Sequence, residues 1–124
     1  MRALALCLML LAGACATPGP QPPPPFLVFF APASAALDEP GLAVLDRAAA
    51  AAKAGGDLLV VGHTSADGTR TANDILSQRR VQAVLRRLAE LGVPPERVTW
   101  RARGEEEAGL DPDGDRRVEI RVGL

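Results

Sequence analysis

Cysteine and histidine, the residues that most often indicate disulfides, metal sites or catalysis, are scarce in this sequence. Its 124 residues include two cysteines, Cys7 and Cys15, and one histidine, His63. Both cysteines lie near the start of the chain, so they cannot cross-link a folded domain, and no Cys/His cluster is available for a metal. Charge of one sign is also lacking, because 14 basic and 15 acidic residues give a net charge of -1. This balance argues against a nucleic-acid-binding protein, which needs a clustered basic surface.

The sequence has no apolar run long enough for a membrane-spanning helix, which needs about 20 apolar residues. The apolar run at positions 3–11 is roughly half that length. It follows Met1 and Arg2 and precedes small residues at positions 12–14, which is the layout of an export signal. We therefore predict that residues 1–14 are a signal peptide that is removed.

A cysteine follows the predicted signal directly, and residues 11–15 resemble the lipobox of bacterial lipoproteins. Ala12 stands where a typical lipobox has leucine. The resemblance implies that Cys15 receives lipid, palmitate included, and several acyl chains give a lasting membrane anchor. Ala16 replaces the aspartate that often retains such proteins in the inner membrane, so the resemblance points to the outer membrane. The alternative is an ordinary cleavage after Ala14, with Cys15 incidental.

Residues 16–25 read ATPGPQPPPP, a proline density that favours extended polyproline II structure. At about 3.1 Å per residue this segment would reach roughly 30 Å. We interpret 15–25 as the lipidated cysteine and a stiff linker. A ligand for an SH3-like partner is the alternative, which the position directly after an anchor disfavours.

Strand and helix patterns alternate over the remaining residues, 26–124, which we predict to be one domain. Strands are expected at 26–30 and 58–61, both buried, and at 98–103 and 118–122, each with one solvent-exposed face. Helices are expected from Glu39 and Pro40 to about Ala52, and from 69 to 91. The order βαβαββ predicts a two-layer α+β fold, a mixed four-stranded sheet with two helices on one face.

One face of the second predicted helix changes character along its length. Its later part is apolar, whereas its first part carries an amide, a hydroxyl and, beside them, the guanidinium of Arg80. The aligned residues are Asn73, Ser77, Val84, Leu88 and Leu91. An inward-facing guanidinium costs several kcal/mol unless it is paired. Arg80 should therefore either meet an internal carboxylate or border a pocket that admits an anion, and the residues alone favour the internal pair.

A set of spaced motifs in residues 26–122 resembles the OmpA-like C-terminal domain, as found in peptidoglycan-associated lipoproteins. The motifs are Gly62-His63-Thr64, Gly68, Asn73, Leu76-Ser77, Arg80, Leu85, Gly92-Val93-Pro94 and the closing Asp115-Arg116-Arg117-Val118-Glu119-Ile120. The resemblance implies a domain that binds the peptide stem of peptidoglycan. It also implies that Arg80 grips a carboxylate of diaminopimelate, which a planar fork of donors suits.

The resemblance supplies the candidate ligand-binding residues, which are Arg80, Asn73, Ser65, Thr64, Leu76 and Asp67. Two positions depart from the family. Ser65 stands where the family has an aspartate that helps to hold the ligand. Ala33 stands in the segment after the first strand where the family usually has an acidic or amide residue. Losing an ionic hydrogen bond typically costs about 1.5–3 kcal/mol, roughly tenfold to a hundredfold in affinity. Asp67 is a candidate substitute carboxylate, the alternative being an ordinary turn aspartate.

The other candidate residues predict no catalysis and no cofactor. His63, Ser65 and Asp67 include the residue types of a hydrolase triad, but they sit in one short turn and cannot adopt its geometry. His63 is expected to be a hydrogen-bonded residue at the end of a strand. Residues 105–107, all glutamate, are expected to be a solvated loop, and residues 111–115 a tight turn.

These observations together predict a non-catalytic lipoprotein of the outer membrane whose periplasmic domain binds the peptidoglycan peptide and tethers membrane to wall. The alternative is a lipoprotein of the same fold whose degenerate wall-binding site leaves it a protein-interaction or scaffold module. The resemblance also raises Tol-system proteins as partners, although no residue identifies that surface. A third class of function, a cell-wall hydrolase, is not supported, because the sequence offers no set of catalytic residues for it.

Overall fold

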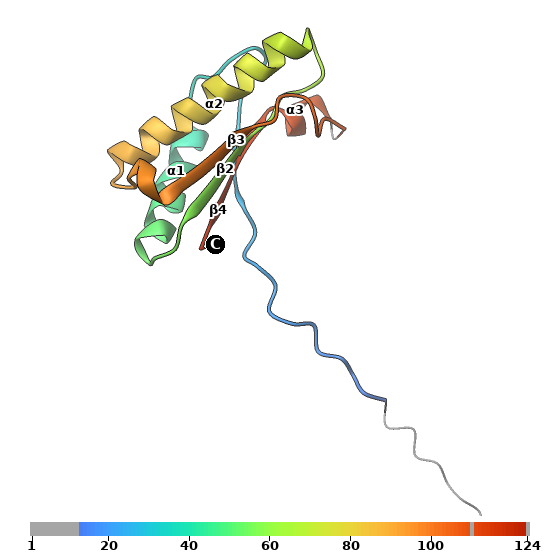
Figure 1. Ribbon diagram of the computed structural model, residues 1–124, viewed down its shortest axis with the longest axis vertical. Helices are drawn as coiled ribbons and strands as arrows, with labels where there is room; N and C mark the ends of the chain where they lie inside the picture. Colours follow the sequence, from blue (N-terminus) through green and yellow to red (C-terminus); the bar gives the residue numbers. More distant parts are fainter. Residues whose placement is uncertain (1–12, 110, 124) are drawn as a thin grey trace, which may run out of the picture.

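A four-stranded sheet with two long helices on one face forms the domain, as predicted (Figure 1). The computed structural model describes residues 13–109 and 111–123. The elements are β1 (Phe26–Phe29), α1 (Glu39–Lys53), β2 (Leu58–Gly62), α2 (Arg70–Glu90), the 3-10 turn η1 (Pro95–Arg97), β3 (Val98–Ala102), α3 (Pro112–Asp115) and β4 (Arg117–Val122).

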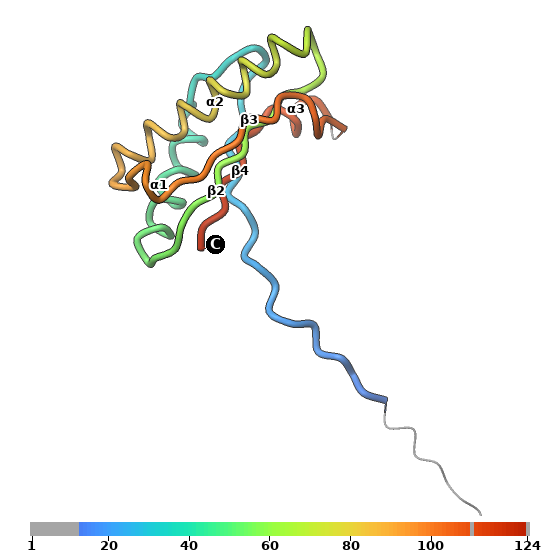
Figure 2. The backbone as a smooth tube through the Cα atoms, viewed as in Figure 1, coloured from blue at the N-terminus to red at the C-terminus, as the bar shows by residue number. Residues whose placement is uncertain are grey.

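The strand order is β1-β4-β2-β3, so the last strand of the chain inserts between the first two. Strand β4 is antiparallel to both β1 and β2, whereas β2 and β3 are parallel. The sheet is therefore mixed, and β1 and β3 form its edges. The tube in Figure 2 shows β2, β3 and β4 running side by side beneath α2.

Side-chain caps fix where the long helices begin. Asp38 accepts a hydrogen bond from the Gly41 amide at 2.9 Å, and Thr69 accepts one from the Ala72 amide at 3.1 Å. Each cap satisfies an amide that the first helical turn leaves without a partner. Helix α2 ends before Gly92, whose φ of 95° suits a residue without a side chain.

The core lies between the sheet and the two helices. It is built by alternate strand residues and by one stripe of each helix, including Val28, Leu45, Val60, Val84, Leu88, Val118 and Ile120, all 0% exposed. The prediction that the first strand is buried was wrong at Phe29, which is 49% exposed. It lies on an edge strand, and a sheet with helices on one side buries only every second residue.

The expected turn at residues 111–115 is a short helix, α3. Asp111 caps it by accepting a hydrogen bond from the Gly114 amide at 2.8 Å. Turn-forming residues favour such a cap as readily as an isolated turn, because aspartate bonds amides that follow it.

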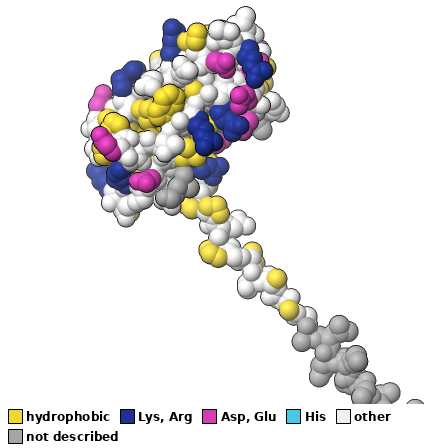
Figure 3. Space-filling model, in the orientation of Figure 1, with side chains coloured by type: hydrophobic (Ala, Val, Ile, Leu, Met, Phe, Trp, Pro, Cys, Tyr) yellow, Lys and Arg dark blue, Asp and Glu magenta, His cyan; other side chains and the backbone are white. Residues whose placement is uncertain are grey.

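Residues 13–25 have no regular secondary structure and project from the domain (Figures 1 and 3). Cys15 is exposed in this segment. Residues 1–12 of the predicted signal peptide lie outside the described residues. None of the helices described here has the length and apolar character to cross a membrane. The projecting segment joins the sheet at Phe26, which pairs with Ile120 near the end of β4.

Gly62, at the end of β2, marks the closest approach of the sheet to α2. A Cβ atom added there would lie 2.6 Å from Cγ2 of Val81 and 2.8 Å from the carbonyl oxygen of Ser77. The Ser77 carbonyl oxygen belongs to the backbone of α2, so it cannot move away by a side-chain rotation. The contact therefore requires glycine at this position.

We predict that Gly62→Ala lowers the free energy of unfolding by about 1–3 kcal/mol, the usual cost of overpacking. Urea denaturation followed by circular dichroism measures the change. Gly109→Ala is the matched control, because nothing lies within 4 Å of its added Cβ, and it should shift stability by less than about 0.5 kcal/mol. Equal effects of both substitutions would contradict the prediction.

Candidate binding pocket

A pocket of about 550 Å³ opens at the end of the sheet where the central strand β2 finishes. Its walls come from the loop after β1, the turn between β2 and α2, the first turns of α2 and the residue before β4. All six candidate residues predicted from the sequence line it, namely Thr64, Ser65, Asp67, Asn73, Leu76 and Arg80. Tertiary structure thus brings them together at one pocket.

Arg80 is held at the wall of this pocket by three carbonyl oxygens. Its Nε donates to Ser34 at 2.8 Å, Nη1 to His63 at 3.1 Å and Nη2 to Ala31 at 3.2 Å. Its guanidinium also lies 5.1 Å from the ring centre of Phe30, within the range of a cation–π contact. The side chain is 0% exposed. Arg80 therefore ties α2 to β1 and β2.

No described carboxylate forms an ion pair with Arg80. The internal ion pair that the residues alone had favoured is therefore wrong. Burial, and to a smaller extent the positive charge of Arg116, lower the pKa of the Arg80 guanidinium to about 10. A group with a pKa near 10 is still charged at neutral pH. The pocket wall thus contains a buried cation whose charge the protein does not neutralise.

The polar first half of α2 is braced by the loop that follows β3. Asn73 donates to the Glu105 carboxylate at 2.6 Å, and the Ser77 hydroxyl accepts from the Gly104 amide at 3.0 Å. Glu105 is therefore a half-buried partner of Asn73, and the prediction that residues 105–107 are only a solvated loop was wrong at this position. Sequence spacing did not reveal the pair because its residues are 32 positions apart.

Ser65 and Asp67 form the acidic side of the pocket. The Ser65 hydroxyl donates to the Asp67 carboxylate at 3.0 Å. Ser65 is buried, whereas Asp67 is exposed. The Thr64 hydroxyl next to them is buried and has no hydrogen-bond partner among the described residues. Asp67 therefore places a carboxylate at the pocket whose lining also includes Ser65.

Ile75, Arg79 and Arg116 are among the pocket residues that the sequence reasoning did not name as candidates. Arg116 belongs to the closing motif of the chain, but nothing in its spacing connects it with α2. It pairs with Asp113 and is 9% exposed. Arginines 79, 80 and 116 against the single Asp67 leave the pocket wall with an excess of positive charge.

His63 follows the end of β2, and its hydrogen bonds are made by its backbone: its amide donates to the Arg117 carbonyl at 2.9 Å, and its carbonyl accepts from Arg80 at 3.1 Å. It is 2% exposed, and neither ring nitrogen has a hydrogen-bond partner among the described residues. The nearest acid is Glu107, whose carboxylate lies 3.8 Å from Nδ1. Burial and then the charge of Arg117 lower the pKa of His63. The imidazole is therefore kept neutral.

Within residues 13–109 and 111–123, no group of three His, Cys, Asp or Glu side chains is placed to hold a metal ion. The domain that emerges is a two-layer α+β module with a positively charged pocket at one end of its sheet. The comparisons identify its family. The model of the OmpA family matches residues 29–120, and the chain belongs to this family. The resemblance and the fold class predicted from the sequence are thereby confirmed.

Solved structures with this fold include the peptidoglycan-associated lipoprotein from Burkholderia pseudomallei, with 28% identity, a TM-score of 0.71, and coverage of 77% of this chain and 87% of that one. The OmpA-like domain of FopA1 from Francisella tularensis has 24% identity, a TM-score of 0.71 and coverage of 77% and 69%. The C-terminal domain of Helicobacter pylori MotB has 21% identity, a TM-score of 0.68 and coverage of 81% and 84%. A search of curated proteins gave no match.

The buried neutral histidine predicts a specific dependence of stability on pH. Unfolded histidine has a pKa near 6.5, and the folded value is lower. The unfolded chain therefore binds more protons as the pH falls through 6.5, so the contribution of His63 is complete above that pH and is lost below it.

Urea denaturation at pH 7.5, 6.5 and 5.5 should show a steeper loss of stability for the wild type than for His63→Gln. The difference in slope can reach about 1.4 kcal/mol per pH unit, the value for one proton. Differences in absolute stability do not enter the comparison. Parallel pH profiles for the two proteins would show that His63 is not the titrating group.

Proposed function

We propose that this chain is a non-catalytic outer-membrane lipoprotein whose periplasmic domain binds the peptide stem of peptidoglycan and so tethers membrane to wall. The observation that carries the proposal is Arg80, a buried guanidinium without an acidic partner at the wall of a pocket. A buried cation of this kind is stabilised by an anion that enters from outside. A planar donor fork suits a carboxylate in particular.

The pocket offers complementary charges for an amino acid such as diaminopimelate, which carries a carboxylate and an ammonium group on one carbon. Arg80 is the candidate for the carboxylate, and Asp67 for the ammonium group, because its carboxylate lies beside Ser65 at the same pocket. Asn73 and the free hydroxyl of Thr64 add polar groups. This set supports binding despite the departure at position 65.

Access to Arg80 requires movement of the loop after β1. Ala31 and Ser34 in this loop accept two of the three hydrogen bonds of the guanidinium. Arginine has five N–H donors, so an incoming carboxylate has donors to use. Pro32 and Ala33, between the two acceptors, are exposed at the pocket. We infer that a ligand displaces this loop when it reaches Arg80.

The positions of the linker and the pocket support a tether. The linker joins the domain at Phe26, beside the end of β4, whereas the pocket lies beyond Gly62, which pairs with Val118 near the start of β4. The two attachment points are thus at opposite ends of the sheet. A lipid on Cys15 and a wall peptide in the pocket would load the domain along its strands.

The alternative function is a scaffold of the same fold that has lost wall binding. The observations that favour it are Ser65 and Ala33 in place of polar residues, and the complete burial of Arg80. Its partners would be other envelope proteins, with the Tol system as one class. The two functions make opposite predictions for binding to isolated wall.

We predict that the full chain, purified in detergent, sediments with isolated diaminopimelate-containing peptidoglycan. Asp67→Asn should lower its affinity roughly tenfold to a hundredfold, because an ionic hydrogen bond is lost. The double variant Ser65→Asp/Asp67→Asn returns the carboxylate to position 65 and should recover binding. Arg80→Ala should abolish sedimentation.

Circular dichroism controls for folding, which matters most for Arg80→Ala because that side chain bonds three carbonyls. The Asp67 variants should remain folded because this residue is exposed, so a loss of binding in them reports on the pocket and not on unfolding. If wild type, Asp67→Asn and Arg80→Ala all pellet equally poorly while remaining folded, the scaffold alternative replaces the tether.

Lipidation is tested separately with a radiolabelled or clickable palmitate in growing cells. The wild-type chain should incorporate label and fractionate with the outer membrane, because several acyl chains anchor it stably. Cys15→Ser should lose both the label and the membrane fraction. Retention of label in that variant would exclude Cys15 as the modified residue.

A further inference from the structure

A second groove, of about 480 Å³, continues from the pocket along the outer side of α2. It shares two wall residues, Ile75 and Arg79, with the pocket. Its other wall residues are Ala35, Gln78, Gln82 and Arg86. The two cavities therefore form one continuous depression.

The spacing of the groove residues explains its direction. Ile75, Arg79, Gln82 and Arg86 follow one another at intervals of four, three and four, which places them on one line along a helix. Arg86 is six positions beyond Arg80, about 9 Å along the helix axis. An extended peptide covers that distance with roughly three residues.

The charge of the groove is positive, because its wall contains two arginines and no acidic residue. Neither Arg79 nor Arg86 has an ion pair or hydrogen bond within the described part of the chain. Arg87 on the same helix, by contrast, pairs with Asp46 at 3.5 Å and with Glu90 at 3.1 Å. The side chains of the two groove arginines are thus available to an external anion.

We propose that this groove is a subsite for a second carboxylate of the same ligand, with Arg86 as the residue that binds it. The ligand class is an elongated acidic peptide with one carboxylate in the pocket and a second carboxylate about 9 Å further along, at Arg86. The amides of Gln78 and Gln82 suit its peptide groups, and Ile75, 46% exposed, suits its aliphatic parts. The inference rests on the proposed function, because it extends the same site.

The test compares two ligands, meso-diaminopimelate alone and the tripeptide L-Ala-γ-D-Glu-meso-diaminopimelate, by calorimetric titration of the full chain in detergent. The wild type should bind the tripeptide more tightly. Arg86→Gln should weaken tripeptide binding about threefold to tenfold, the loss of one partly solvated charge contact, and leave diaminopimelate binding unchanged. Arg86→Lys should retain part of the advantage, and salt should reduce it.

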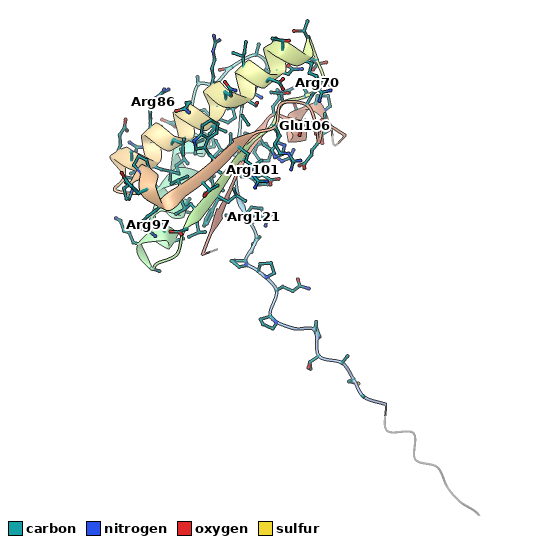
Figure 4. The ribbon with its side chains drawn as sticks, in the orientation of Figure 1. Arg70, Arg86, Arg97, Arg101, Glu106 and Arg121 are labelled. Atoms are coloured by element: carbon teal, nitrogen blue, oxygen red, sulfur yellow. The ribbon has the colours of Figure 1, made fainter. Side chains whose placement is uncertain are left out.

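Arg101→Gln is the matched control, with the same change of charge at an exposed arginine of β3 whose side chain likewise has no partner among the described residues. Figure 4 shows Arg86 projecting from α2 and Arg101 from β3. Equal affinities of the wild type for the two ligands, or equal losses in Arg86→Gln and Arg101→Gln, would overturn the subsite. Failure of the wild type to bind either ligand would instead overturn the proposed function, and the subsite with it.

Discussion

The burial of one guanidinium without an acidic partner constrains this domain more than any other contact. Arg80 bonds carbonyl oxygens from the loop after β1 and from the end of β2, and it projects from α2. Three segments that are far apart in the sequence thus depend on one side chain. Because a buried charge costs several kcal/mol unless polar groups surround it, these carbonyls stabilise the fold as long as no ligand replaces them around Arg80.

The same constraint explains the character of the pocket. Carbonyl dipoles satisfy donors of Arg80 but cannot cancel its charge, and Arg116 adds a second positive charge nearby. The pKa of Arg80 is lowered mainly by burial and secondarily by the charge of Arg116. A negatively charged ligand would balance the charge of Arg80. An acidic residue of the protein paired with Arg80 would have left no place for such a ligand. The fold is therefore suited to an anion from outside.

Membership of the OmpA family accounts for the fold, while the pocket of this chain has its own arrangement of acid. The carboxylate stands at Asp67 and is held by Ser65, two positions from where the resemblance expects it. Such a displacement keeps the charge at the pocket and changes its reach. The pocket of this chain thus has a hydroxyl at position 65 and a carboxylate at position 67.

The sequence by itself determined the four strands, the two long helices, their order along the chain and the inward stripe of α2, because alternating and helical apolar patterns and capping residues act over a few neighbouring positions. It also supplied the six pocket residues, through ordered motifs. Only the tertiary structure decided that Arg80 meets carbonyls, that Glu105 binds Asn73 and that Arg116 reaches the pocket. These contacts join residues tens of positions apart, and no local preference encodes which polar group will lie opposite another.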